Sequence, residues 1–191
     1  QRPPYQFALL SRGGAELMIA EGALANPEVD ASFGLHVTSL LPSHVIGVRG
    51  GPLMASADQF RIRVLGRQTH GSAPWRGIYP IVTAAQVVLG LQTIVSRGVD
   101  ISHEPAVVTI GTIKGGVREN IIPDSVELVG TIRTFDEGMR QAVFADLKYL
   151  AEHVSAAHGA TAVVQAPDTQ GNPVTKNDPD LTARVVPSLV R

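Results

Sequence analysis

Hydrophobic and polar positions alternate most regularly between residues 59 and 65. Phe60, Ile62 and Val64 are separated by polar or charged residues, which is the period-two pattern of a strand with one buried face. Later runs rich in β-branched residues are bounded by glycine or proline and have the same character. They predict three more strands, at residues 106–113, 125–133 and 161–166.

Two longer segments repeat their hydrophobic residues at the helical period. The first spans residues 79–97 and is followed by Gly98, a natural helix stop; its apolar stripe comprises Ile81, Ala84, Ala85, Val88, Leu91, Ile94 and Val95. The second ends at Gly159, and its stripe comprises Met139, Val143, Leu147, Leu150 and Val154. Thr134 and Glu137 have the spacing of a capping box, which predicts the start of this second helix.

These segments follow one another as strand, helix, strand, strand, helix, strand. Two helices on one face of a four-stranded antiparallel sheet form the ferredoxin-like arrangement, an α/β fold of the α+β kind. We therefore predict a ferredoxin-like domain over residues 53–168.

The segment before this domain has a weaker pattern. Residues 13–24 predict a short helix, and the alternation in residues 29–37 predicts a strand that contains His36. A crossover rich in glycine and proline follows at residues 43–54.

Beyond the domain, a polar linker leads to Asn177, Asp178 and Pro179, which predict another helix with a cap residue and proline in its first turn. Both flanks therefore look like pieces of one interrupted domain. We assign residues 1–52 and 169–191 to an α/β domain that the ferredoxin-like domain interrupts.

Composition and charge exclude several classes of function. The net charge is −1 and the chain has one Trp and three Tyr, so neither nucleic acid nor an anionic membrane surface is an expected partner. No apolar run approaches the roughly 20 residues that cross a bilayer. The absence of cysteine removes disulfides and thiolate metal sites. It favours the cytoplasm and leaves the periplasm open.

Four polar residues are candidates for chemistry, and each has a structural alternative. His36 is a metal ligand or a hydrogen-bonded core histidine, and a metal site would need three or four ligands. His70, in a loop with glycines and a proline, is an exposed histidine or a donor that stabilises an oxyanion. The default role of Asn120 is turn chemistry through its side-chain amide. Arg133 is a solvated charge or a bidentate clamp on a carboxylate.

Four short motifs occur in an order that is typical of one family. They are Phe33-Gly-Leu-His-Val37, residues 66–74 with Thr69-His70-Gly71, Gly115-Gly116 followed by Asn120-Ile-Ile-Pro-Asp124, and Gly130-Thr-Ile-Arg-Thr134. From about Gly13 onwards, the chain resembles the metal-dependent amidohydrolases and peptidases that include hippurate hydrolases, N-acyl-amino-acid amidohydrolases, aminoacylases and indole-acetyl-amino-acid hydrolases.

The resemblance implies a catalytic domain that binds two divalent ions, usually zinc, with manganese, cobalt or nickel as alternatives. A ferredoxin-like lid would interrupt it and form a homodimer. By resemblance, His36 is a metal ligand and His70 stabilises the oxyanion in the partner subunit's active site. Asn120 and Arg133 would hold the substrate's carboxylate end. The implied reaction is attack of a metal-activated water on the amide of an N-acyl amino acid or peptide-like substrate.

The chain differs from the family pattern in the segment that carries catalytic residues in the family. Before the segment Gly13-Gly-Ala-Glu16, the family has Gln-Pro-Ala-Glu-Glu with its general base and a metal ligand, whereas residues 1–12 contain no acidic residue. Tyr79 also stands where the family usually has Asp. We therefore expect a fragment, or the product of a truncated or frame-shifted gene, that binds no metal and is inactive alone.

Two further interpretations stay open at the level of sequence. The chain could be a non-catalytic module that dimerises through its sheet edge and first helix and caps a substrate. It could also be an unrelated ferredoxin-like regulatory domain that binds an amino acid, although the co-occurrence of four family motifs argues against this.

Overall fold

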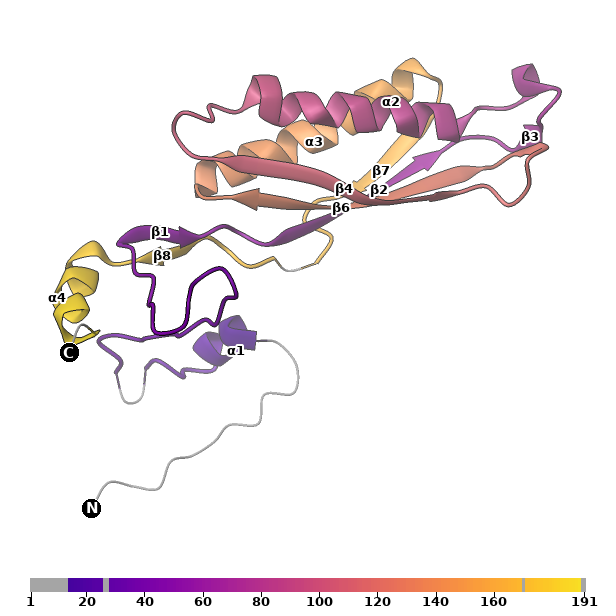
Figure 1. The fold of residues 1–191 in the computed structure, drawn as a ribbon. Helices are drawn as coiled ribbons and strands as arrows, with labels where there is room; N and C mark the ends of the chain where they lie inside the picture. Colours follow the sequence, from indigo (N-terminus) through magenta and orange to yellow (C-terminus); the bar gives the residue numbers. More distant parts are fainter. Residues whose placement is uncertain (1–13, 26–27, 170, 190–191) are drawn as a thin grey trace. The chain divides into compact units, whose positions relative to one another are not determined.

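The computed structural model describes residues 14–25, 28–169 and 171–189 (Figure 1). The chain divides into two units, Gln1–Ile46 and Gly47–Arg191. The second unit contains nearly all of the regular structure.

The second unit contains the predicted ferredoxin-like domain. Its four-stranded sheet is antiparallel and has the order β4-β6-β2-β7, which is the order that a ferredoxin-like connection produces. The elements along the chain are β2 (Asp58–Leu65), α2 (Pro80–Thr93), β4 (Ala106–Gly115), β6 (Ser125–Thr134), α3 (Glu137–Ala157) and β7 (Thr161–Gln165). Both helices cover the same face of the sheet (Figure 1).

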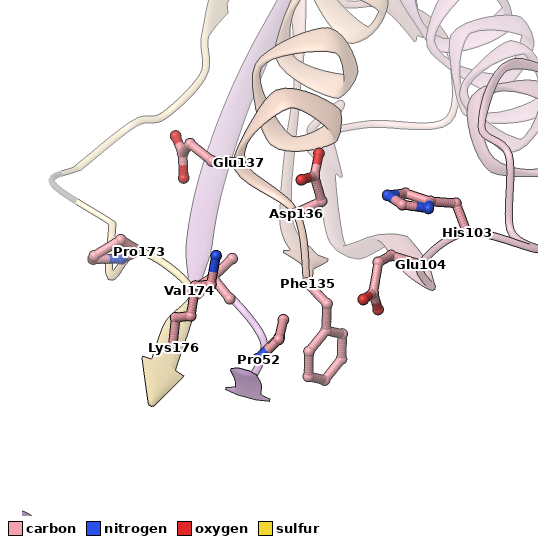
Figure 2. A pocket seen from close by; sticks show the side chains of 9 residues that line it. All are labelled: Pro52, His103, Glu104, Phe135, Asp136, Glu137, Pro173, Val174 and Lys176. Atoms are coloured by element: carbon pink, nitrogen blue, oxygen red, sulfur yellow. The ribbon is translucent and has the colours of Figure 1, made fainter. Parts of the chain in front are cut away.

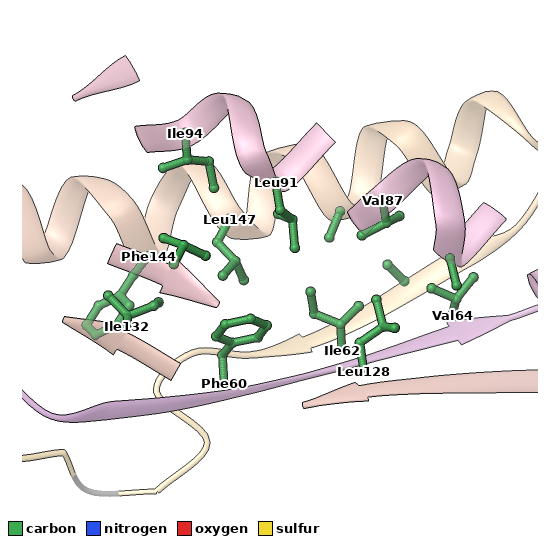
Figure 3. Close-up of a cluster of buried hydrophobic side chains, with 14 of the residues drawn as sticks. Phe60, Ile62, Val64, Val87, Leu91, Ile94, Leu128, Ile132, Phe144 and Leu147 are labelled. Carbon is green, nitrogen blue, oxygen red and sulfur yellow. The ribbon is translucent and has the colours of Figure 1, made fainter. Parts of the chain in front are cut away.

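The hydrophobic core lies between that face and the two helices (Figure 3). The alternation in β2 places Phe60, Ile62 and Val64 inside, all fully buried. Leu91 from α2 and Leu147 from α3 meet them from above. The other face of the sheet carries charged residues, such as the Arg61–Glu127 pair at 2.9 Å. The period-two pattern of the sequence thus reports which face of the sheet is covered.

α2 does not present the whole predicted stripe to the core. Its buried residues are Pro80, Thr83, Ala84, Val87 and Leu91, whereas Ile81 is 40% exposed and Ala85 is also exposed. The prediction was wrong for these two residues because α2 packs against the sheet and α3 with the face that carries Ala84, Val87 and Leu91, which leaves Ile81 and Ala85 facing solvent. α2 continues as η2 (Ile94–Gly98), and together they are long and apolar enough to cross a membrane by length and composition. The burial of Leu91 in the core identifies them instead as a core helix.

α3 begins differently from the predicted capping box. Asp136 is the cap residue, and its side chain accepts from the backbone amide of Met139 at 2.7 Å. Thr134 still belongs to β6, where its buried hydroxyl lies 3.2 Å from that of Ser56. The prediction of Thr134 and Glu137 as the capping pair was therefore wrong, because the sheet holds Thr134 until the strand ends.

A buried ion pair joins the start of β2 to the first turn of α3. Nε and Nη2 of Arg140 donate to the two carboxylate oxygens of Asp58, at 2.8 and 2.6 Å. The Asp58 side chain is fully buried. Hydrogen bonds from the guanidinium to Asp58 raise the pKa of Arg140 above its usual range, so Arg140 stays charged in the folded protein.

Two small antiparallel ribbons extend the domain at its ends. At one end, β1 (Gly51–Met54) pairs with β8 (Thr175–Asn177), and α4 (Pro179–Leu189) follows. The cap predicted for α4 is present, because the Asp178 carboxylate accepts from the Leu181 amide at 2.7 Å. At the other end, β3 (Thr69–His70) pairs with β5 (Ile121–Ile122).

The first unit contains α1 (Gly14–Ala20), within the predicted helix at residues 13–24; residue 13 lies outside the described residues. The strand predicted for residues 29–37 was wrong. Residues 30–37 have no strand pairing, and all of them are exposed. An alternating segment becomes a strand only against a partner, and the described residues of this unit supply none.

Candidate functional site

The loop after β2 is shaped by its contact with β5. His70 pairs with Ile121, and the Gly71 amide donates to the carbonyl of Asn120 at 2.7 Å. A side chain at Gly71 would meet the Asn120 backbone at 3.2–3.4 Å, so glycine permits the close crossing of the two segments. The carbonyl of His70 accepts from the Ala73 amide at 2.9 Å. These bonds fix the backbone on both sides of the imidazole.

The His70 ring is exposed and is held from one side only. Its Nδ1 lies 3.1 Å from the Ser72 amide nitrogen and 2.7 Å from the Ser72 hydroxyl. Among the described residues, Nε2 has no hydrogen-bond partner. The second ring nitrogen is therefore available to a ligand or to another molecule.

Asn120 lies directly beside this histidine. Its backbone carbonyl is used by Gly71, while its side-chain amide makes no hydrogen bond within the described part of the chain and is exposed. The imidazole lies on β3 and the carboxamide in the turn that leads into β5, so two exposed polar residues belong to segments that cross here. The structure thus brings together two of the four residues that the sequence singles out.

Arg133 lies at the opposite end of the domain. β6 spans ten residues from Ser125 to Thr134, which corresponds to about 30 Å, and the His70 loop is at its Ser125 end. One guanidinium nitrogen of Arg133 donates to the carbonyl of Ser56 at 3.3 Å. Within one copy of the domain, Arg133 and His70 therefore cannot bind the same small molecule.

His36 belongs to the first unit and is exposed. Its Nδ1 lies 2.9 Å from the carbonyl oxygen of Val37, the next residue. No group of three or more histidine, aspartate or glutamate side chains that could hold a metal occurs among the residues described. These residues do not fit the two-metal centre that the resemblance implies.

A shallow hollow of about 360 Å³ lies beside the His70 loop. Ile121, the β5 partner of His70, is part of its wall. Its other walls come from Gln68, from the end of β4 with Lys114, Gly115, Gly116 and Val117, and from Pro123, Asp124 and Ser125. This hollow gives the exposed end of the sheet space for a group next to the histidine.

A second hollow, of about 260 Å³, lies at the end of the domain near β1 and β8 (Figure 2). Its wall includes Asp136 and Glu137, but both carboxylates are already engaged. Asp136 caps α3, and Glu137 accepts from Arg140 at 2.8 Å. The remaining polar wall residues are His103, Glu104 and Lys176. This hollow contains none of the predicted site residues, so we do not regard it as the candidate site.

Two features of this arrangement were not anticipated from the sequence. Ser72 was part of the loop motif but had no assigned role, although a serine two residues after a histidine can reach its ring. β8 was read as linker, because three polar residues, Thr175–Asn177, have no alternation. Only its partner β1 identifies it as a strand.

The described residues of this domain expose polar groups at its surface but do not form a complete catalytic site. One end of the sheet exposes His70 and Asn120, and at the other end the chain enters and leaves through paired strands. Reciprocal bonds between Ala57 and Asn172, both at 2.9 Å, connect the two crossing segments.

Comparison with known proteins identifies this class. Residues 55–159, more than half of the chain, match the model of the M20 peptidase dimerisation domain. The chain belongs to the M20 peptidase family. The match confirms the family resemblance and the assignment of a dimerisation domain, and the strand order confirms the ferredoxin-like fold.

Curated relatives match beyond the dimerisation domain. Thermostable carboxypeptidase 2 of Saccharolobus solfataricus is 38% identical over 177 residues, which cover 93% of this chain and 44% of the carboxypeptidase. The N-acyl-L-amino acid amidohydrolase of Geobacillus stearothermophilus is 41% identical over 149 residues, 78% of this chain and 40% of the relative. This chain therefore spans less than half the length of these relatives.

Solved structures of two related proteins resemble this chain in fold. A protein of methicillin-resistant Staphylococcus aureus superposes with a TM-score of 0.81 and 32% identity, over 94% of this chain and 45% of the other. The Bacillus subtilis YXEP protein, described as a dinuclear metal-binding peptidase of the M20 family, gives a TM-score of 0.70 and 34% identity, over 92% and 42%. Both cover this chain almost completely and share its fold.

Proposed function

We propose that this chain is the dimerisation lid of a metal-dependent amidohydrolase that cleaves the amide bond of N-acyl amino acids or small peptides. The observation that carries the proposal is the exposed pair His70 and Asn120, which lies on a domain that matches the M20 dimerisation domain. Relatives named as an N-acyl-L-amino acid amidohydrolase and an N-acetylcysteine deacetylase support the substrate class.

In this proposal the lid contributes hydrogen-bond donors to a site whose metal ions are held elsewhere. The described residues offer no metal site, so we propose that the ions are held outside the described residues and that the chain alone is inactive. His70 would donate to the oxygen that becomes negative as water adds to the amide carbon. A donor that is already aimed at this oxygen lowers the barrier without reorganising.

The distance between His70 and Arg133 supports a site shared between two subunits. A small substrate that contacts both residues must bridge two copies of the lid, because β6 separates them by about 30 Å within one copy. We propose that His70 and Asn120 serve the partner's site, while Arg133 serves the site of its own subunit.

We propose that the two copies meet along β4 and α2. β4 is an edge strand with unpaired backbone groups, and its Ile113 is 59% exposed. Ile81 and Leu89 of α2, 40% and 64% exposed, continue this apolar surface. Gly116 lies against Ile81, which joins the end of β4 to the helix. A two-fold arrangement of such edges would form one continuous sheet.

The proposed activity is tested with a hybrid enzyme. Residues 55–159 of this chain replace the matched segment of the Geobacillus stearothermophilus N-acyl-L-amino acid amidohydrolase, and hydrolysis of a panel of N-acyl amino acids is measured. We expect turnover, and we expect His70→Ala to lower kcat by about 10²–10³-fold, the usual effect of removing one oxyanion donor. His153→Ala, on the exposed side of α3, is the matched control.

The chain itself is tested for metal content and for turnover of the same panel. We expect neither bound zinc nor hydrolysis. Two equivalents of metal with turnover would refute the proposal that the metal site lies elsewhere, and ligands would then have to be sought among residues 1–13. An active hybrid that is insensitive to His70→Ala would refute the assigned role of that residue. Location in the cytoplasm stays a prediction.

A further inference from the structure

The hydrogen bonds at His70 determine which ring nitrogen carries the proton. A backbone amide nitrogen always has its hydrogen and can only donate. The Ser72 amide lies 3.1 Å from Nδ1 and points its hydrogen at it, so Nδ1 must offer its lone pair. In the neutral ring the proton is then on Nε2.

The Ser72 hydroxyl strengthens the same arrangement. Its oxygen is 2.7 Å from Nδ1, and because Nδ1 is unprotonated, the hydroxyl is the donor. One residue thus supplies two donors to one ring nitrogen. The backbone cannot move away easily, because Gly71 is bonded to Asn120 and Ala73 to the His70 carbonyl.

We propose that Ser72 is the positioning residue for His70, which it holds as the Nε2–H tautomer with that N–H directed outward. The inference rests on the proposed function and deepens it, because it assigns His70 a single chemical role. An Nε2–H group donates to an oxyanion. It has no lone pair at Nε2 with which to bind a metal ion or to accept a proton from water.

The chain contains a histidine with the opposite arrangement. Nδ1 of His153 lies 2.7 Å from the carbonyl oxygen of Tyr149, and a carbonyl oxygen can only accept. His153 therefore carries its proton on Nδ1. A single spectrum of this protein should show the two tautomers side by side, with His153 as an internal reference.

The experiment is long-range ¹H–¹⁵N correlation spectroscopy of the full chain labelled with ¹⁵N-histidine, at alkaline pH where the imidazoles are neutral. We expect His70 to show a protonated Nε2 and an unprotonated Nδ1, and His153 to show the reverse. Substitution of Ser72 by alanine removes the hydroxyl donor and keeps the amide. We expect it to lower the ratio of the Nε2–H to the Nδ1–H tautomer of His70 about fivefold. This change corresponds to about 1 kcal/mol, the net contribution of one hydrogen bond.

Ser72→Thr keeps the hydroxyl and should restore the wild-type spectrum. Ser96→Ala, in which an exposed hydroxyl on η2 is removed, should leave His70 unchanged. A protonated Nδ1 at His70, or a His70 spectrum that does not respond to Ser72→Ala, would overturn the proposal. The measurement needs neither metal nor substrate, so its failure is distinct from failure of the hybrid enzyme to turn over N-acyl amino acids.

Discussion

Single residues of this domain are fixed by close packing at a few points. Gly130, in the motif that follows the loop of Asn120, lies under the ring of Phe60 and beside the carbonyl of Thr109. The motif Gly130-Thr-Ile-Arg-Thr134 includes this glycine, but nothing in the sequence explains why glycine is needed there. The reason is the aromatic ring on the neighbouring strand, which occupies the space that a side chain would need.

Gly130→Ala should therefore destabilise the domain. The added methyl group overlaps the Phe60 ring and the Thr109 carbonyl, so the core must shift, and we expect a loss of about 1–3 kcal/mol in the free energy of unfolding. Urea denaturation followed by circular dichroism measures it. In the control, Gly90→Ala on α2, the new methyl group lies 3.6 Å from Val154 and should stabilise the helix by about 0.5–1 kcal/mol. Equal stability of the two variants would contradict this account.

The ion pair of Asp58 and Arg140 gives a second prediction at this scale. Arg140→Met leaves the fully buried carboxylate of Asp58 without its cation, and we expect a loss of about 3–5 kcal/mol in unfolding free energy. Arg61→Met removes a partly exposed arginine that pairs with Glu127 and Asp168, and we expect a much smaller loss of stability, because solvent screens exposed ion pairs. If chemical denaturation showed similar losses of unfolding free energy for the two variants, burial of Asp58 would not explain the contribution of this ion pair to stability.

At the scale of elements, hydrophobic periodicity was sufficient to predict a helix or strand wherever that element packs against other parts of this chain. β2 and α3 were predicted within a few residues, because their apolar stripes face a core that the chain itself completes. The strand predicted at residues 29–37 failed for the complementary reason, since no partner for it is described. Ile81 in α2 was apolar but outward-facing, and sequence cannot distinguish a core face from an interface face.

The candidate site was less predictable than the fold. His70 and Asn120 lie near each other because β3 pairs with β5. Each of these strands has only two residues, which is too short to show a hydrophobic period in the sequence. The roles given to His36 and Arg133 came from resemblance and stay predictions, as do the domain boundaries at residues 53 and 168. A motif identifies residues, but only strand pairing shows which of them meet.

The outward face of α2 should control association. Leu89→Glu places a charge on the outward side of α2, where Leu89 is 64% exposed. In the proposed interface we expect it to convert a dimer into a monomer in sedimentation-velocity experiments at micromolar concentration. Ile113→Lys should act in the same way, because a lysine on an edge strand opposes pairing with another edge. The control is Tyr149→Glu, since Tyr149 is 60% exposed but lies on α3, away from β4. A dimer that survives both α2 and β4 substitutions must use another surface.

At the scale of the whole molecule, the proposed function requires two separate regions. The edge formed by β4 and α2 must be free to join a second copy, and the loop with His70 must remain accessible so that it can serve a catalytic site. Trp75 reports on the second region, because it follows this loop in η1 (Pro74–Arg76) and is 76% exposed. It is the only tryptophan in the sequence.

Trp75 should therefore stay exposed when the chain dimerises. We expect its fluorescence maximum and its quenching by acrylamide to remain constant over the concentration range in which sedimentation shows the dimer forming. The physical reason is that the proposed interface lies along the strand and helix, while the tryptophan lies at the end of the sheet beside β3. The Leu89→Glu variant supplies the monomer reference at the same concentration. A blue shift with reduced quenching on dimerisation would place the loop inside the interface, where His70 would be unable to donate to a substrate.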